Sequence, residues 1–173
     1  MPIMAVVRGG TQDAAMPQQE IPTMPVSEIC SRGVVIASPD DSLRTVAELM
    51  RQHHVGSVVV TRDQNGLCLP VGIVTDRDIV LALIAKDVPP DAVSAGDVMS
   101  EPLETIDETD EVWTTLERMR SRGLRRLPVV GSRGELVGIV SADDLLELVA
   151  EELTNLARII NREQRRESTV RSG

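Results

Sequence analysis

The stretch Gly72-Ile73-Val74-Thr75-Asp76-Arg77-Asp78-Ile79 decides the fold, because a second version of it occurs at Gly138-Ile139-Val140-Ser141-Ala142-Asp143-Asp144-Leu145. In both copies an apolar run leads into a hydroxyl residue, and a carboxylate follows three positions later. A Ser or Thr with an acidic residue at that spacing is typical of a helix start. The sequence therefore predicts, twice, a buried strand that ends where a helix begins.

The two stretches belong to a longer internal repeat. Ile29-Cys30-Ser31 aligns with Val98-Met99-Ser100 at an offset of 69 residues (98 minus 29). At the repeated stretch the offset is 66 (138 minus 72), because the first repeat has a longer loop around Asp63-Gln64-Asn65-Gly66. Repetition at this length indicates two supersecondary units that bury their apolar faces against each other.

Each repeat predicts the same order of elements: a strand, a helix, a hairpin of two strands and a second helix. The first strands are expected at 34–37 and 103–106, and the first helices are expected to be capped by Asp40 or Asp41 and by Asp107 or Thr109. Asn65-Gly66 is typical of a tight hairpin turn. The expected apolar faces of these helices are Leu43, Val46, Ala47 and Met50 in the first repeat and Val112, Leu116 and Met119 in the second.

The pattern predicts an α+β fold with two pseudo-symmetric βαββα units packed through their sheets, followed by a long C-terminal helix. That last helix is expected from Asp143 to about Glu167. We expect four segments: a disordered leader at 1–24, repeat one at 25–88, repeat two at 89–150, and a helical extension and tail at 151–173.

Composition narrows the classes of partner. The chain has 173 residues, a formal net charge of −9, and Trp113 as its one aromatic residue among Phe, Trp and Tyr. This composition argues against nucleic-acid and anionic-membrane binding, and no run approaches transmembrane length. Cys30 and Cys68 lie far apart and no secretory signal is apparent, so we expect a cytoplasmic protein with reduced thiols.

The repeated signature suits phosphate and ribose. The free N–H groups and the positive dipole end of a helix start favour phosphate, and the hydroxyl of Thr75 or Ser141 can add a hydrogen bond. Asp78 or Asp144, one helical turn further on, can accept from both ribose hydroxyls. The structural alternative is a capping box at each helix start. The matching strand before both copies favours the functional interpretation.

The joint pattern resembles a tandem pair of CBS domains, the Bateman module, over roughly residues 25–150. The resemblance implies two clefts between the sheets, with AMP, ADP or ATP as a regulatory ligand and no required cofactor. By motif position, Thr75 and Ser141 match phosphate-contacting hydroxyls, and Asp78 and Asp144 match ribose-binding carboxylates. The segments that carry the resemblance, besides the repeated signature, are 26–29, 55–60, 95–100 and 124–130.

The resemblance also implies roles for neighbouring residues. Ile73 and Ile139 match apolar residues that lie against the base, and Arg125, three residues before Pro128, matches a phosphate-contacting arginine. Repeat one departs here, with Gly56 and Val59 at the corresponding positions, so the two clefts are expected to be unequal. Arg77 is either a compensating charge or a solvated helix residue.

No catalytic or metal site is expected. His53 and His54 lie at a helix end, where the dipole favours them, and their spacing from Cys30 and Cys68 matches no zinc pattern. The repeats leave no room for a catalytic domain. The sequence therefore predicts a non-enzymatic regulatory module.

Trp113 and the last helix are candidates for an interface. Trp113 either anchors a subunit contact or packs against its own chain's last helix. A coiled-coil-like 4-3-4 spacing connects Val149, Leu153, Leu156 and Ile160. We expect a homodimer that acts on an effector protein in trans; the alternative is a structural dimerisation or partner-binding protein with vacant clefts.

Overall fold

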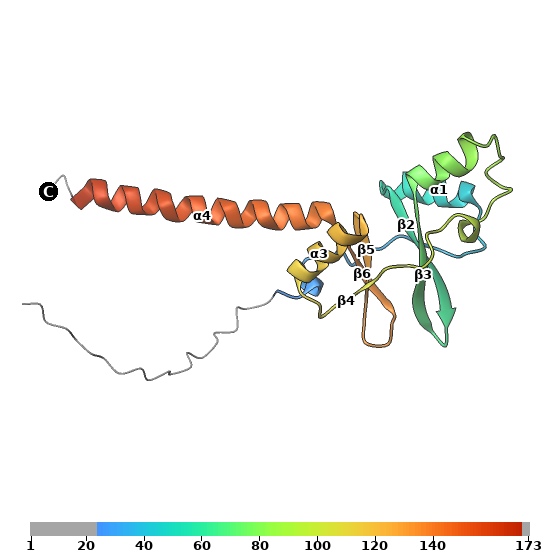
Figure 1. Cartoon of the computed structure of the whole chain (residues 1–173), viewed down its shortest axis with the longest axis horizontal. Coiled ribbons are helices and arrows are strands. Elements are labelled where there is room, and N and C mark those ends of the chain that lie inside the picture. The colour runs from blue at the N-terminus through green and yellow to red at the C-terminus, as the bar shows by residue number, and fades with distance from the viewer. Residues whose placement is uncertain (1–23, 171–173) are drawn as a thin grey trace, which may run out of the picture.

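The computed structural model describes residues 24–170, with side chains as far as Ile159. Two three-stranded sheets, ordered β1-β2-β3 and β4-β5-β6, lie next to each other in the middle of the molecule, with helices on their outer sides (Figure 1). This arrangement confirms the predicted fold class. The predicted leader, except for Met24, and the side chain of Ile160 lie outside the described residues.

After the 3-10 turn at its start, the first repeat contains one sheet and three further helical segments. Strand β1 pairs parallel with β2, and β2 pairs antiparallel with β3 through a turn in which Asn65 and Gly66 both have positive φ (56° and 78°). Such a turn is the kind that Asn-Gly favours, as the sequence predicts. The elements are β1 (Ile36–Ala37), α1 (Leu43–His53), β2 (Ser57–Gln64), β3 (Leu67–Thr75), α2 (Asp76–Ile79) and the π-helix η2 (Val80–Ile84).

The second repeat has the same topology. Strand β4 pairs parallel with β5, and β5 pairs antiparallel with β6. The elements are β4 (Ile106–Asp107), α3 (Val112–Arg122), β5 (Arg126–Val130), β6 (Leu136–Ser141) and α4 (Ala142–Val170). Helix α4 projects well beyond the sheets, as Figure 1 shows, which confirms the predicted long C-terminal helix.

The predicted caps of the two first helices are wrong. Ser42 caps α1, because its hydroxyl accepts from the Thr45 N–H, while the Asp41 carboxylate accepts from the Ser38 N–H at 2.7 Å in the turn before the helix. Helix α3 begins after Glu111, which makes no side-chain cap bond.

In the second repeat, Asp107 instead closes its own turn by accepting from the Thr109 N–H at 2.9 Å. Side chains that can cap a helix can equally close a tight turn. At these positions the carboxylates bond within the turn and do not cap the helix.

The helix faces are largely as predicted. Leu43, Val46 and Met50 are buried in repeat one, as are Val112 and Met119 in repeat two, whereas Leu116 is exposed. Thr115 is buried in place of Leu116, because its hydroxyl donates to the Glu111 carbonyl one turn earlier and is thereby satisfied.

Two short segments cross between the repeats. The 3-10 turn η1 (Val26–Glu28) lies at the start of repeat one, yet Val26 is buried in the core of repeat two with Ile106 and Leu127. The aligned turn η3 (Ala95–Asp97) lies at the start of repeat two, and Ala95 is buried in the core of repeat one. Each core is therefore completed by a segment from the start of the other repeat.

Backbone hydrogen bonds fix both crossings. The Ser31 N–H donates to the Ile139 carbonyl and the Ile139 N–H donates to the Ser31 carbonyl, both at 2.9 Å, which adds Ser31 to the edge of β6. In the other half, the Ser100 N–H donates to the Ile73 carbonyl of β3 at 3.0 Å. These bonds satisfy edge groups of each sheet and hold the two repeats together.

Candidate functional site

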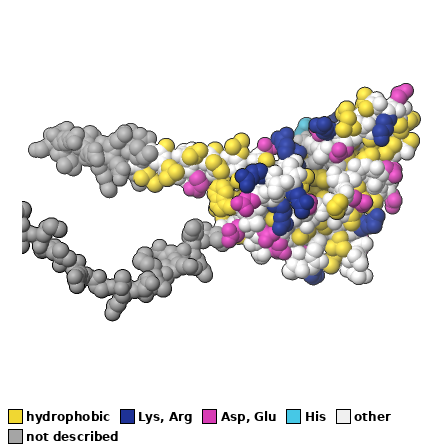
Figure 2. All heavy atoms as spheres, viewed as in Figure 1, with side chains coloured by type: hydrophobic (Ala, Val, Ile, Leu, Met, Phe, Trp, Pro, Cys, Tyr) yellow, Lys and Arg dark blue, Asp and Glu magenta, His cyan; other side chains and the backbone are white. Residues whose placement is uncertain are grey.

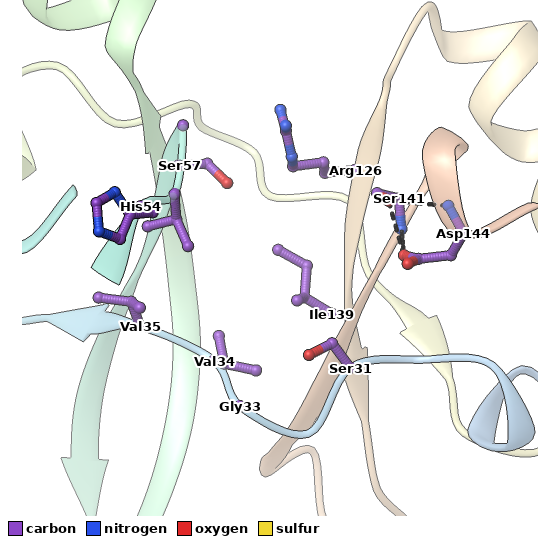
Figure 3. A pocket seen from close by; sticks show the side chains of 12 residues that line it. Ser31, Gly33, Val34, Val35, His54, Ser57, Arg126, Ile139, Ser141 and Asp144 are labelled. Carbon is purple, nitrogen blue, oxygen red and sulfur yellow. Dashed lines mark hydrogen bonds between the residues drawn. The ribbon is translucent and has the colours of Figure 1, made fainter. Parts of the chain in front are cut away.

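A cleft of about 270 Å³ opens between the two repeats at the end of β6 (Figure 3). Repeat two contributes the signature residues and one arginine, and repeat one contributes the opposite wall. The lining residues are Ser31, Gly33, Val34, Val35, His54, Val55, Gly56, Ser57, Arg126, Ile139, Ser141 and Asp144. The cleft thus has a polar end at the helix start and a mainly apolar wall across from it.

The polar end is built by the junction of β6 with α4. The Asp144 carboxylate accepts from the Ser141 N–H and from the Ser141 hydroxyl, both at 2.7 Å, and the Ser141 hydroxyl accepts from the Asp144 N–H at 3.2 Å. This is a capping box, so the structural interpretation of the motif holds. Both bonds to the carboxylate use Oδ2, which leaves Oδ1 free of hydrogen bonds from the described residues.

The first repeat carries the same geometry. The Asp78 carboxylate accepts from the Thr75 N–H at 2.8 Å and from the Thr75 hydroxyl at 2.7 Å, again through Oδ2. Capping and ligand binding are therefore compatible in both copies, because the cap uses only one carboxylate oxygen and leaves the other for a hydroxyl donor.

The predicted apolar and basic residues do not all meet in this cleft. Ile139 lines it, whereas Pro128 is buried in β5, paired with Ile139 across the hairpin. Arg125 is exposed, with its guanidinium 3.9 Å from the Asp143 carboxylate, and it is not among the lining residues. Its neighbour Arg126 lines the cleft instead.

In the first repeat, Ile73 is half-buried in β3 and Arg77 is exposed on the first turn of α2. The Ile73 carbonyl accepts from the N–H of Ser100, the residue aligned with Ser31. The segment after η3 therefore bonds to the strand that leads into Thr75 and Asp78. In the same way, the segment after η1 bonds to the strand that leads into Ser141 and Asp144.

Most of the cleft was missed by sequence reasoning. Gly33, Val34 and Val35 come from the connection that follows the crossed segment, and His54 to Ser57 come from the end of α1. The signature could not identify them because they belong to the other repeat. The backbone bonds between Ser31 and Ile139 help to hold this wall opposite the signature.

The Cys30 thiol lies next to the cleft residue Ser31 and is affected by burial. Burial raises the pKa of the Cys30 thiol, which lies among the core residues of repeat two behind Ser31, although the nearby Arg32 opposes the shift. A raised thiol pKa lowers the thiolate fraction at neutral pH. Cys30 therefore behaves as a small packing residue, as its alignment with Met99 suggests.

The duplicated strand–helix junctions match a known family. A family model described as the CBS domain matches residues 26–85 and 95–151. The chain belongs to the CBS domain family. Both matches span the signature of their repeat, and together they form the tandem pair that the sequence predicts.

Relatives of this CBS pair include two proteins of known source. An uncharacterized protein of Methanopyrus kandleri is 38% identical over 71% of this chain, which spans 61% of that relative's length. Hypoxic response protein 1 of Mycobacterium tuberculosis is 30% identical, with 72% of this chain and 84% of the relative covered.

Solved structures show the same fold. A conserved CBS domain protein of Thermoplasma acidophilum superposes with a TM-score of 0.64 at 26% identity, over 72% of this chain and 68% of that one. The CBS domain pair of protein MJ0100, solved with 5′-methylthioadenosine and S-adenosyl-L-methionine, gives 0.66 at 24% identity, covering 76% of this chain and 99% of that one. CBS pairs of this kind are generally regulatory modules.

Hypoxic response protein 1 was crystallised with two coordinated zinc ions, and that structure superposes with a TM-score of 0.62 at 27% identity, over 72% of this chain and 98% of that one. Within residues 24–159 of the present chain, His, Cys, Asp and Glu side chains form no group of three or more placed to hold a metal. Across the part of the chain that the structure describes, no helix combines the length and the apolar character needed to span a bilayer.

Proposed function

We propose that this CBS pair is a non-enzymatic sensor that binds an adenine nucleotide in the Ser141–Asp144 cleft. The observation that carries the proposal is that one cleft joins a helix-start signature, an arginine and an apolar wall from the other repeat. A phosphorylated nucleoside needs these three surroundings for its phosphate, ribose and base. The ligands of the MJ0100 pair, both adenosine derivatives, support the same chemical class.

The geometry suggests how each part is held. Phosphate lies at the start of α4, where backbone N–H groups and the Ser141 hydroxyl supply donors. The Arg126 guanidinium, whose Nη2 would lie 3.9 Å from a Cβ on Gly56 of the opposite wall, is proposed to reach the phosphate from that side. A ribose hydroxyl donates to the free Oδ1 of Asp144. The base lies against Ile139 and the repeat-one wall at Val34 and Val35. The Thr75–Asp78 junction is proposed as a second site of the same kind.

Ligand in this cleft touches both repeats at once, so its affinity depends on how they are placed relative to each other. A state in which the walls fit the nucleotide is favoured by its differential binding energy. This coupling is the proposed signal, and an effector protein that distinguishes the two states receives it.

Isothermal titration calorimetry with AMP, ADP, ATP and NAD tests the proposal. Asp144→Ala is expected to weaken nucleotide binding at least tenfold, and Asp144→Ala with Asp78→Ala to abolish it. Asp97→Ala is the matched control, because Ser94 and Asp97 form the same capping box, with bonds of 2.8 and 2.7 Å, away from the cleft. Absence of heat with the wild type, or equal affinities in all variants, contradicts the proposal.

A second function, self-association or partner binding, is favoured by the surface of α4. Leu153 and Leu156 are 61% and 56% exposed, and Trp113 on α3 is 60% exposed. Figure 2 shows hydrophobic side chains along the projecting part of α4. The described side chains of α4 from Ala150 to Ile159 are all exposed. An isolated helix gains little stability alone, so a second copy packed on this stripe would stabilise it.

Sedimentation across a dilution series tests this second function. The wild type is expected to be a dimer at micromolar concentration, and Leu153→Glu with Leu156→Glu to be a monomer with unchanged nucleotide affinity. If Trp113 takes part, its fluorescence shifts to longer wavelength on dissociation. A wild type that stays monomeric at all concentrations overturns this function without affecting the nucleotide site.

A further inference from the structure

His54 has a backbone conformation that few residues other than glycine adopt. It ends α1 as the C-cap with φ 55° and ψ 41°, in the left-handed region, and its N–H donates to the Met50 carbonyl. The aligned residue of repeat two is Gly123, which ends α3 with φ 66°. The same chain thus shows the residue that this backbone favours, and repeat one keeps a histidine there at a conformational cost.

The side chain of His54 lies in the cleft. Its imidazole stands on the repeat-one wall near Val35, across from the wall that carries Ile139, Ser141 and Asp144 (Figure 3). The preceding residue, His53, is exposed on α1 and does not line the cleft. Both histidines are exposed, but only His54, the one with the unfavourable backbone, lines the cleft.

The wall around His54 offers little else to a base. The other repeat-one residues in the lining are Gly33, Val34, Val35, Val55 and Gly56, which have no polar side-chain atoms, and two serines, Ser31 and the buried Ser57. The chain has no Phe or Tyr, and Trp113 lies on the outside of α3. Among the described residues, His54 thus brings the only planar ring to this cleft.

We infer that His54 is the base-recognition residue of the Ser141–Asp144 cleft. This rests on the proposed nucleotide function. The imidazole stacks on the base or exchanges a hydrogen bond with its edge. The ligand then spans the cleft, with the phosphate at α4, the ribose at Asp144 and the base against His54. The unfavourable backbone is retained because the ring is needed there.

Paired ligands test the assignment. AMP carries a base, whereas ribose 5-phosphate presents only the ribose and phosphate. In titrations, His54→Gly is expected to lower AMP affinity about tenfold, the loss expected when a base loses a stacking ring, and to leave ribose 5-phosphate affinity unchanged. The thermal midpoint of ligand-free His54→Gly is expected to equal or exceed that of the wild type, since glycine suits this backbone.

His53→Asn is the control and is expected to bind AMP as the wild type does. His54→Asn keeps a residue that accepts the left-handed backbone but removes the ring, and it is expected to match His54→Gly in binding. Equal losses for AMP and ribose 5-phosphate, or wild-type AMP affinity in both His54 variants, overturn the inference. If the wild type binds neither ligand, the proposed nucleotide function itself fails.

Discussion

The two repeats share a backbone plan but differ at the residues that face a ligand. Where repeat two ends its first helix with Gly123, repeat one has His54, and where repeat two begins its next strand with Arg126, repeat one has the buried Ser57. Because the cleft takes its walls from both repeats, these differences meet in one place: His54 and Arg126 both line it. The comparison teaches that near-symmetric halves can concentrate ligand chemistry on one side.

The helices after the signatures differ as strongly. Helix α2 has four residues and passes into the π-helix η2, which ends at Ile84, whereas α4 has 29 residues. Val80, Leu81 and Ile84 are exposed on the short segment and Leu153 and Leu156 on the long one. The same junction therefore starts a helix that stops within the module and one that extends beyond it.

The largest loss of stability is expected when a side chain in either core is shortened. Leu127 and the aligned Val58 are both fully buried. Leu127→Ala should lower the free energy of unfolding by about 3 kcal/mol and Val58→Ala by about 2 kcal/mol, since the longer side chain leaves the larger cavity. Urea denaturation measures both values. A change below about 1 kcal/mol for Leu127→Ala contradicts the core described for repeat two.

Because the crossed segments pack closely on two glycines, we expect an alanine at either glycine to destabilise the fold by a similar amount. A Cβ on Gly138 would lie 2.8 Å from the Cys30 sulfur and 3.0 Å from the Ser31 carbonyl oxygen, and a Cβ on Gly72 would overlap Met99. Gly138→Ala and Gly72→Ala should each destabilise the fold by roughly 1–3 kcal/mol. Gly33→Ala is the control, because its Cβ meets nothing within 4 Å. Equal stability for all three chains would show that the segments do not lie over these strands.

A smaller effect, on AMP affinity, is expected to differ between two adjacent arginines. Arg126→Ala should weaken AMP binding about tenfold by removing a charged donor to the phosphate, and leave the affinity for adenosine unchanged. Arg125→Ala should change neither, since its side chain is exposed beside Asp143. Isothermal titration calorimetry with AMP and with adenosine measures these affinities. A larger loss in Arg125→Ala would favour the role that the family resemblance implies for Arg125.

The smallest effect concerns acid stability. Hydrogen bonds from the Ser94 side chain and backbone lower the pKa of Asp97, and those from Thr109 lower the pKa of Asp107. A carboxyl with a lower pKa in the folded state stabilises the fold above its unfolded pKa of about 4, and this contribution is lost as the pH falls through the folded value.

Asp97→Asn and Asp107→Asn should therefore each flatten the decline of the thermal midpoint below pH 4, one through the crossed turn on repeat one and the other through repeat two. An unchanged acid slope in both variants would show that these turns make no contribution.

The sequence was most informative where local and tertiary signals agree. The strand–helix junctions at Thr75 and Ser141, the Asn65-Gly66 turn and the long last helix are local patterns, and the structure has all of them. The caps of α1 and α3 were misplaced because several neighbouring polar residues compete for the same turn, and local propensity does not decide among them.

Only the signature side of the site was predicted. Ser141, Asp144 and Ile139 follow from the repeated signature and the resemblance, and they line the cleft. Val34, His54 and Arg126 do not follow, because they face the signature only through the packing of one repeat on the other. The alignment of His54 with Gly123 was visible in the sequence, but its meaning depends on the backbone conformation that the structure provides.

Because of the crossed segments, one sequence repeat is not an independent folding unit. During synthesis, the first sheet and its helices leave the ribosome before Ala95, the residue that completes their core. Val26 leaves first of all the core residues and stays without its partners until Ile106 and Leu127 follow. A chain cut at residue 90 would thus leave both fragments incomplete, and the protein becomes stable only as a whole.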